Sequence, residues 1–298
     1  MTISIFFQPG EPVIYESFDE ILSLEKYDLI KYIICRHCNL IKLPTLPRML
    51  VGLYCEDNYL TELPELPFRL KELRCCKNQL ESLPKLPYYL EELYCAYNNL
   101  NELPDLVFND YDKFGILTGN ENKYEEGGSI RKLWCENNKI TILPKLPFTL
   151  HILNCSNNCL TEFPELPQNI NSLDISFNKL KKIPVNLIHL WYLMYIDYSN
   201  NEVSTSIPWF ADELDVLKCS NNPLGYVNYV LPNKLSVFQC LNTNLKTIPN
   251  LPKYLRSLGC NKELFENMQK KFPEFDFKST EDSEDDENEN EGVQTDNQ

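Results

Sequence analysis

Cysteine is the reactive side chain that this sequence uses most conspicuously, with 12 in 298 residues. Such a set can pair in disulfides, bind zinc, supply a nucleophile or fill buried positions. The stretch CRHC at Cys35 has the spacing of zinc and redox motifs, but no second ligand pair with suitable spacing follows it. Cys76 follows Cys75 directly, and we expect it to face outward as the exposed, reactive thiol.

Most of the cysteines belong to a repeated pattern, L-x-x-L-x-C-x-x-N-x-L. Its clean copies begin at Leu50, Leu70, Leu90, Ile130 and Leu150, and their cysteines are residues 55, 75, 95, 135 and 155. Later copies place Ile175 and Tyr198 in the cysteine column, and a column that accepts such residues is typical of a buried apolar site. We therefore interpret these thiols as reduced and structural, with Cys38 standing in the asparagine column. A chain this long buries its own core and needs no disulfide framework.

The pattern continues beyond the clean copies. Further units begin at Ile30, Ile170, Leu193, Leu214, Leu235 and Leu255. A degenerate unit from Phe114, with Gly119 in the cysteine column, fills the 40-residue gap between Cys95 and Cys135. If Phe114 does not begin a strand, residues 107–129 are an inserted loop. Counting the degenerate unit, we predict about twelve repeats.

Proline pairs join the copies, as in LPTLP from Leu43, LPELP from Leu63 and LPKLP from Leu83. With these connectors the pattern resembles the leucine-rich repeats of the short LPxLP class, found in bacterial type III effectors and in proteins of large DNA viruses of amoebae. The resemblance covers roughly residues 30–265. It implies an α/β solenoid, a leucine-rich repeat horseshoe with a parallel β-sheet on its concave side. The prolines lack backbone donors and fix φ, which predicts an extended, polyproline-like convex side.

The ends of the chain complete the predicted organisation. Residues 1–29 form an N-terminal cap with Ser17 and Glu20 as a capping box, and 30–262 form the solenoid. Residues 263–278 form a C-terminal cap helix, since Leu264, Phe265, Met268 and Phe272 recur at helical spacing. Residues 279–298 hold nine acidic residues and no lysine or arginine, which predicts a disordered acidic tail.

Composition narrows the classes of function. The net charge is −15 and no basic stripe is visible, which argues against nucleic acid. There is no apolar run of 18 residues and no secretory signal at the start, so we expect a cytoplasmic location, including a host cytoplasm, no membrane contact and a monomer. The three histidines belong to different repeats, and we predict no enzyme activity, cofactor or metal. Some effectors with similar repeats carry a C-terminal ubiquitin-ligase domain, but only a cap and the tail follow Cys260 here.

The outward residue before the cysteine column carries the functional prediction. Reading along the stack, this column places aromatic residues and an arginine in its first half, where they have no core to fill. Tyrosine, tryptophan and arginine dominate binding energy at protein interfaces, although strands also favour aromatic residues that stack between rungs. The predicted partner-binding residues, with neighbouring columns, are Tyr54, Glu56, Glu72, Arg74, Tyr94, Tyr97, Lys132 and Trp134.

We therefore predict a non-enzymatic scaffold that binds an unidentified protein on the concave face. The alternative is an effector or adaptor that brings its partner to a ubiquitin ligase or another host enzyme through residues 1–29 or 279–298. Deletion of either segment with the repeats kept would separate the two readings.

Overall fold

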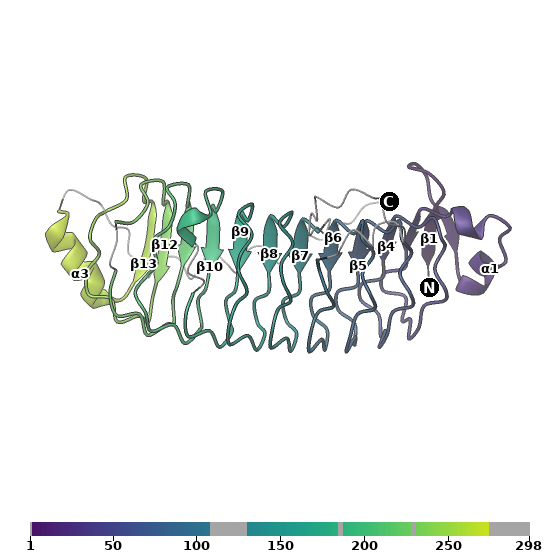
Figure 1. The fold of residues 1–298 in the computed structure, drawn as a ribbon, viewed down its shortest axis with the longest axis horizontal. Coiled ribbons are helices and arrows are strands. Elements are labelled where there is room, and N and C mark those ends of the chain that lie inside the picture. The colour runs from purple at the N-terminus through teal and green to yellow at the C-terminus, as the bar shows by residue number, and fades with distance from the viewer. Residues whose placement is uncertain (1, 108–129, 184–186, 228–229, 274–298) are drawn as a thin grey trace, which may run out of the picture.

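A computed structural model describes residues 2–107, 130–183, 187–227 and 230–273. Within these residues the chain forms one elongated ladder built on a 13-stranded sheet (Figure 1). The eleven strands β3 to β13 run parallel and follow the order of the sequence. They are β3 (Tyr32–Ile34), β4 (Gly52–Tyr54), β5 (Glu72–Arg74), β6 (Glu92–Tyr94), β7 (Lys132–Trp134), β8 (Ile152–Asn154), β9 (Ser172–Asp174), β10 (Tyr195–Asp197), β11 (Val216–Lys218), β12 (Val237–Cys240) and β13 (Ser257–Cys260).

Each strand is short because only a few residues of a copy can alternate between the core and the outside. In β5 the central Leu73 is fully buried, whereas Glu72 and Arg74 on either side are half-buried. The register keeps copies in phase, with Leu53 opposite Leu73 and Tyr54 opposite Arg74. Residues of one repeat position therefore stack into columns along the whole sheet. The outward side of these columns is called the strand face below.

The asparagine column fixes the turn that follows each strand. Asn58 Nδ2 donates to the carbonyl oxygens of Cys35 (2.8 Å) and Cys55 (3.0 Å), and its Oδ1 accepts from the backbone nitrogens of Cys38 and Leu40, both at 3.0 Å. One buried side chain thus satisfies backbone groups of two neighbouring repeats. The same position is held by Asn78, Asn98, Asn138, Asn158, Asn178, Asn201 and Asn222.

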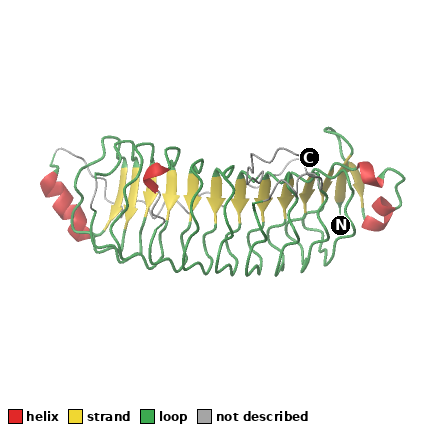
Figure 2. Ribbon diagram, viewed as in Figure 1, coloured by secondary structure: helices red, strands yellow, loops and turns green. Residues whose placement is uncertain are grey.

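The connectors between repeats are mostly loops. Their leucines point into the core, as Leu63 and Leu66 do in the LPELP connector. Among the described connectors of the repeats, one short 3-10 helix, η2 (Leu187–His189), interrupts these loops (Figure 2). The polyproline conformation of the connectors and the horseshoe curvature stay predictions.

The described sheet passes directly from the repeat of Cys95 to the repeat of Cys135. Strand β6 pairs directly with β7, with Glu92 opposite Lys132 and Tyr94 opposite Trp134. The sheet thus passes from the repeat of Cys95 to that of Cys135 without an intervening rung, so the described part of the ladder has eleven parallel strands instead of twelve. Residues 108–129, including Phe114 and Gly119, lie outside the described residues.

Additional elements cover both ends of the stack of parallel strands. At the start, β1 (Ile3–Phe6) and β2 (Val13–Tyr15) form an antiparallel hairpin, and β1 pairs with β3. One of the two bonds of the predicted capping box is present, because Ser17 Oγ accepts from the backbone nitrogen of Glu20 at the start of α1 (Phe18–Leu22). A short 3-10 helix, η1 (Tyr27–Leu29), leads into the first repeat.

At the other end, α3 (Lys262–Lys271) buries Leu264 and Met268 against the last repeat. Residues 274–298, with the predicted acidic tail, lie outside the described residues. Neither described α-helix is long and apolar enough to span a bilayer.

Candidate functional site

The cysteines form a structural column. Ten of the twelve are buried, and none is in a disulfide. Cys35 and Cys38 of the CRHC stretch are both buried, and the described residues contain no group of three or more His, Cys, Asp or Glu side chains placed to hold a metal. Cys38 Sγ contacts the carbonyl of Arg36 at 3.2 Å, as Asn58 contacts that of Glu56, which confirms that Cys38 stands in the asparagine column.

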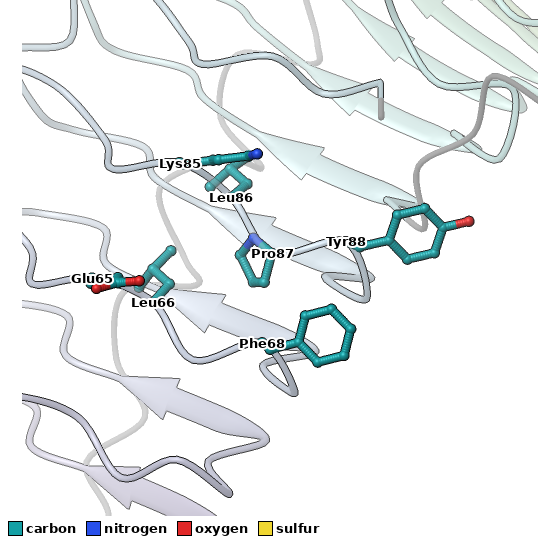
Figure 3. A pocket seen from close by; sticks show the side chains of 7 residues that line it. All are labelled: Glu65, Leu66, Phe68, Lys85, Leu86, Pro87 and Tyr88. Carbon is teal, nitrogen blue, oxygen red and sulfur yellow. The ribbon is translucent and has the colours of Figure 1, made fainter. Parts of the chain in front are cut away.

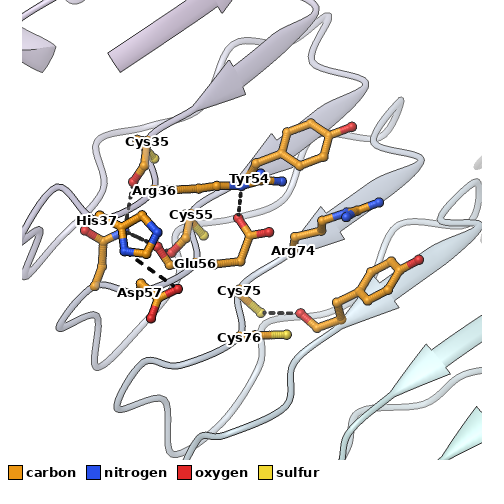
Figure 4. A network of polar contacts seen from close by, with 12 residues as sticks. Cys35, Arg36, His37, Tyr54, Cys55, Glu56, Asp57, Arg74, Cys75 and Cys76 are labelled. Carbon is orange, nitrogen blue, oxygen red and sulfur yellow. Dashed lines mark hydrogen bonds and ion pairs between the residues drawn. The ribbon is translucent and has the colours of Figure 1, made fainter. Parts of the chain in front are cut away.

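The prediction that Cys76 is a reactive thiol is wrong. Cys76 lies one position beyond the buried column and is partly buried (Figure 4). Burial raises its pKa to about 11, so little thiolate forms at neutral pH. Neighbouring rungs cover this position, which the sequence pattern alone treats as outward.

The strand face brings four of the predicted residues into one stack. Tyr54, Arg74, Tyr94 and Trp134 occupy the last position of β4, β5, β6 and β7. The Arg74 guanidinium lies 5.4 Å from the Tyr54 ring centre and 4.5 Å from that of Tyr94. Tyr94 and Trp134 are stacked at 4.4 Å with an interplanar angle of 6°. We call Tyr54, Arg74, Tyr94 and Trp134 the aromatic ladder.

Two glutamates, Glu72 and Glu92, hold side chains of the aromatic ladder in place through hydrogen bonds. Glu72 accepts from Tyr54 Oη and from the Arg74 guanidinium, both at 2.6 Å. Because the Tyr54 side chain is partly buried and bonded to Glu72, its pKa is raised. These charge-assisted bonds fix the orientation of the side chains that the ladder presents.

Glu92 has the same role on the next rung. It accepts from Tyr94 Oη at 2.9 Å and pairs with Lys132 Nζ at 3.0 Å. Burial opposes ionisation of Glu92, but the hydrogen bonds from Lys132 and Tyr94 outweigh it and lower its pKa. Burial, and then the bond to Glu92, raise the pKa of Tyr94 to about 12. The network is therefore charged and bonded at neutral pH.

Two residues that the prediction did not include complete the first end of the ladder. Arg36 lies 5.2 Å from the Tyr54 ring centre and donates to Glu56 at 2.9 Å (Figure 4). Gly52 leaves the space that the neighbouring rings occupy, since a Cβ there would come within 2.6 Å of Tyr32 Cδ1 and 3.0 Å of Tyr54 Cε2. The sequence signal for Gly52 was the absence of a side chain in a column that is otherwise filled.

Tyr97 is the predicted residue that stands apart from the ladder. It lies in the turn after β6, is 52% exposed and has φ of 54°. A bulky residue in the left-handed region is strained, and asparagine takes this position in several other repeats, as at Asn157 and Asn200. Tyr97 thus presents an exposed ring in the turn that follows β6, at a cost in backbone strain.

Beyond Trp134 the same columns become polar and acidic. Asp174 Oδ1 accepts from the backbone nitrogen and the hydroxyl of Ser176, at 3.0 and 2.7 Å. Burial raises the pKa of Asp197, and the nearby Asp174 raises it further. Glu136, which follows β7, has its pKa raised by burial and by Asp174, and its Oε2 is buried without a hydrogen-bond partner.

The connector side carries two hollows at the same repeat position. One, of about 240 Å³, lies between successive connectors and is lined by Glu65, Leu66, Phe68, Lys85, Leu86, Pro87 and Tyr88 (Figure 3). The other, of about 630 Å³, includes Leu146, Phe148 and Pro167. Their recurrence indicates that they arise from the packing of one connector on the next.

Comparison with known proteins identifies the fold. No family model matches the chain, and no curated protein matches its sequence. YopM from Yersinia enterocolitica WA-314 is similar at 29% identity and a TM-score of 0.56, over 76% of this chain and 50% of that one. The functional domain of InlJ from Listeria monocytogenes, described as including a cysteine ladder, has 23% identity and a TM-score of 0.58 over 86% and 57%.

A third solved structure, the leucine-rich repeat domain of APL1B, has 16% identity and a TM-score of 0.53 over 84% of this chain and 80% of that one. This chain spans only about half the length of the YopM and InlJ chains that it matches. The relation to the short LPxLP class and to viral proteins stays a prediction. The parallel solenoid and these likenesses together give the chain the fold of the leucine-rich repeat proteins.

Proposed function

We propose that this protein is a non-enzymatic interaction scaffold that binds a protein partner on its strand face. Repeat solenoids of this kind present extended surfaces that are used for binding, which supports a scaffold role. The observation that carries the proposal for this face is the aromatic ladder, a continuous stack of tyrosine, arginine and tryptophan over four rungs.

The ladder has two properties of a binding surface. Its residues are of the types that contribute about 2 kcal/mol or more each at the centre of interfaces. Glu72 and Glu92 also fix their side chains in advance, so a partner would lose little free energy in ordering them. Stacking between rungs stabilises the sheet as well, so a test must separate folding from binding.

The remaining features of the function belong to the same proposal. The chain acts as a monomer in the cytoplasm, including a host cytoplasm, without nucleic acid or a cofactor. The net charge of −15 supports a protein partner over a nucleic acid.

The test is affinity capture from a cytosolic lysate with a variant that lacks the ladder rings. Tyr54→Ala, Tyr94→Ala and Trp134→Ala are combined in one chain, and circular dichroism confirms that it is folded. The matched control combines Phe68→Ala, Phe148→Ala and Tyr254→Ala, which removes three exposed rings from the turns that precede the strands.

We expect a protein that binds the wild type and the control but is lost from the ladder variant. Purified, that protein should bind the ladder variant at least 100-fold more weakly, the effect of losing about 3 kcal/mol. Equal capture by all three folded proteins would refute binding at the ladder.

A further inference from the structure

The strand face changes its charge balance at β7. Over β4 to β7 the acidic side chains are paired, as Glu72 is with Arg74 and Glu92 is with Lys132. Past Trp134, the next carboxylates are those of Glu136, just after β7, Asp174 on β9 and Asp197 on β10. In the described part of the chain, none of these three has a lysine or arginine nitrogen within 4.0 Å. Lys218, opposite Asp197 on β11, acts electrostatically on Asp197, so in that part of the chain the negative charge without a nearby cation is that of Glu136 and Asp174.

Among these carboxylates, Glu136 has the least favourable surroundings. Its Oε2 is buried and has no hydrogen-bond partner, although a carboxylate oxygen out of water normally has one. A buried charge without a partner is destabilising, and a cation brought by another molecule would supply what is missing. Asp174 lies close enough to interact electrostatically with Glu136, so one cation between them would attract both carboxylates.

Trp134 offers an aromatic ring face on which such a cation can stack. One face of its indole is stacked on Tyr94 of the preceding rung, nearly parallel to it. The other face is therefore directed toward β8, where the corresponding residue is the smaller Asn154. Asn154 Oδ1 accepts from the backbone nitrogen and hydroxyl of Ser156, at 3.1 and 2.8 Å. Among the contacts of the described residues, no ring and no cation stacks on this second indole face.

We propose that the strand face over β7 to β10 recognises an arginine side chain of the protein partner, with its guanidinium stacked on Trp134 and hydrogen-bonded to Glu136 and Asp174. The inference rests on the proposed function and names the chemistry of the partner at that site. A guanidinium suits the site better than an ammonium, because it is planar, stacks on indole and offers several N–H donors in a fixed fork. The chain uses the same arrangement internally, where Arg74 stacks on Tyr94 and pairs with Glu72.

The test uses the full chain, labelled with ¹⁵N, and two tripeptide probes. Acetyl-Gly-Arg-Gly-amide carries the guanidinium, and acetyl-Gly-citrulline-Gly-amide has nearly the same shape without the charge. The readout is the indole N–H signal of Trp134, assigned with Trp134→Phe, and the signals of Trp191 and Trp209 serve as internal controls. Chemical shifts are followed as each peptide is added.

We expect the arginine peptide to shift the Trp134 signal saturably, with half-saturation at least tenfold lower than for the citrulline peptide. Glu136→Gln combined with Asp174→Asn should raise the half-saturation concentration at least tenfold. The matched variant, Glu162→Gln with Glu202→Gln, removes the same charge at exposed positions and should leave the titration unchanged.

Equal shifts with both peptides would overturn the inference, as would an unchanged titration of the Glu136 and Asp174 variant. The inference would also be overturned if the Trp134 signal had not shifted when the arginine peptide reached about 10 mM. The two proposals fail separately. If the ladder variant loses its partner in the capture experiment but the peptide does not bind, the scaffold stands and the arginine assignment falls.

Discussion

Glu92 and Glu136 lie on one face, one at the start of β6 and the other just past the end of β7, yet their surroundings act on them in opposite directions. Hydrogen bonds from Lys132 and Tyr94 lower the pKa of Glu92 even though burial opposes this. Burial, with Asp174 nearby, raises the pKa of Glu136. The ionised form of Glu92 therefore stabilises the fold at neutral pH, whereas that of Glu136 destabilises it.

We predict that Glu92→Gln and Glu136→Gln change the midpoint of thermal unfolding at pH 7 in opposite directions. Glu92→Gln should lower the midpoint slightly, with a loss of about 0.5 kcal/mol in stability or less, because Glu92 is only partly buried and solvent screens its ion pair with Lys132. Glu136→Gln should raise it, on the order of 1 kcal/mol, because it removes an unpaired buried charge. Calorimetry between pH 3 and pH 8 measures both effects.

The sign of each effect fixes its dependence on pH. The stability that Glu92 contributes is present above the ordinary glutamate pKa of about 4.3 and is lost as the pH falls through its lowered pKa. The cost of Glu136 disappears as the pH falls through its raised pKa. Both variants should therefore approach the wild type in acid. Destabilisation by Glu136→Gln at pH 7 would contradict the environment described for this residue.

At the residue scale, the repeat made the cysteine column predictable. Ile175 and Tyr198 in the same column indicated a buried position, and Cys95 is fully buried. The burial of Cys76 was not predictable, because it depends on how neighbouring rungs cover that position. Arg36 was missed because its side chain reaches the Tyr54 ring from a different column, a contact that depends on rotamers and not on spacing.

At the scale of the element, each repeat depends on its asparagine. Asn98 Nδ2 donates to the carbonyl oxygens of Cys75, Cys95 and Ala96 at 3.0 to 3.2 Å, and its Oδ1 accepts from the backbone nitrogen of Leu80 at 3.0 Å. The side chain is buried, so water cannot readily replace it. Its removal would leave several backbone groups of two repeats without partners.

We predict that Asn98→Ala lowers the free energy of unfolding by about 3 kcal/mol, measured by urea denaturation. The matched control is Asn99→Ala, since Asn99 is the next residue in the same turn and, among the described residues, it forms a hydrogen bond through its backbone alone. That control should change stability by less than about 0.5 kcal/mol. Equal effects of the two substitutions would contradict the role given to the asparagine column.

The elements that the sequence did not reveal are those outside the repeat. The hairpin of β1 and β2 extends the sheet beyond β3 and covers its edge, but its residues occur once and give no periodic signal. The pairing of β6 with β7 was likewise hidden, because a 40-residue spacing fits both a weak repeat and an insertion. Only the register of the sheet separates these alternatives.

For the whole molecule, the stacked repeats form one long strand face whose two halves differ. The first half is a stack of rings beside charges that are paired within the chain, and the second carries carboxylates, of which Glu136 has one oxygen without a hydrogen-bond partner. Because residues of one repeat position stack in register, a residue type that recurs in successive repeats forms a continuous surface several rungs wide. The fold and the position of the strand face were predictable from period and phase alone, but the pairing of charges across rungs required the structure.

The measurement that tests the central claim most directly is site-specific photo-crosslinking from two exposed turns of the folded protein, one after a strand and one before a strand. A benzoylphenylalanine replaces Tyr97, in the turn after the strand of Tyr94, in one chain and Tyr254, in a turn before β13, in another. The two tyrosines are 52% and 53% exposed, so the probes are equally accessible. Each is irradiated with the partner recovered by capture.

We predict a covalent adduct with the partner from position 97 and none from position 254. The adduct from position 97 should also disappear when Tyr54, Tyr94 and Trp134 are replaced by alanine in a chain that remains folded. An adduct from position 254 and none from position 97 would contradict the account and place the partner away from the strand face.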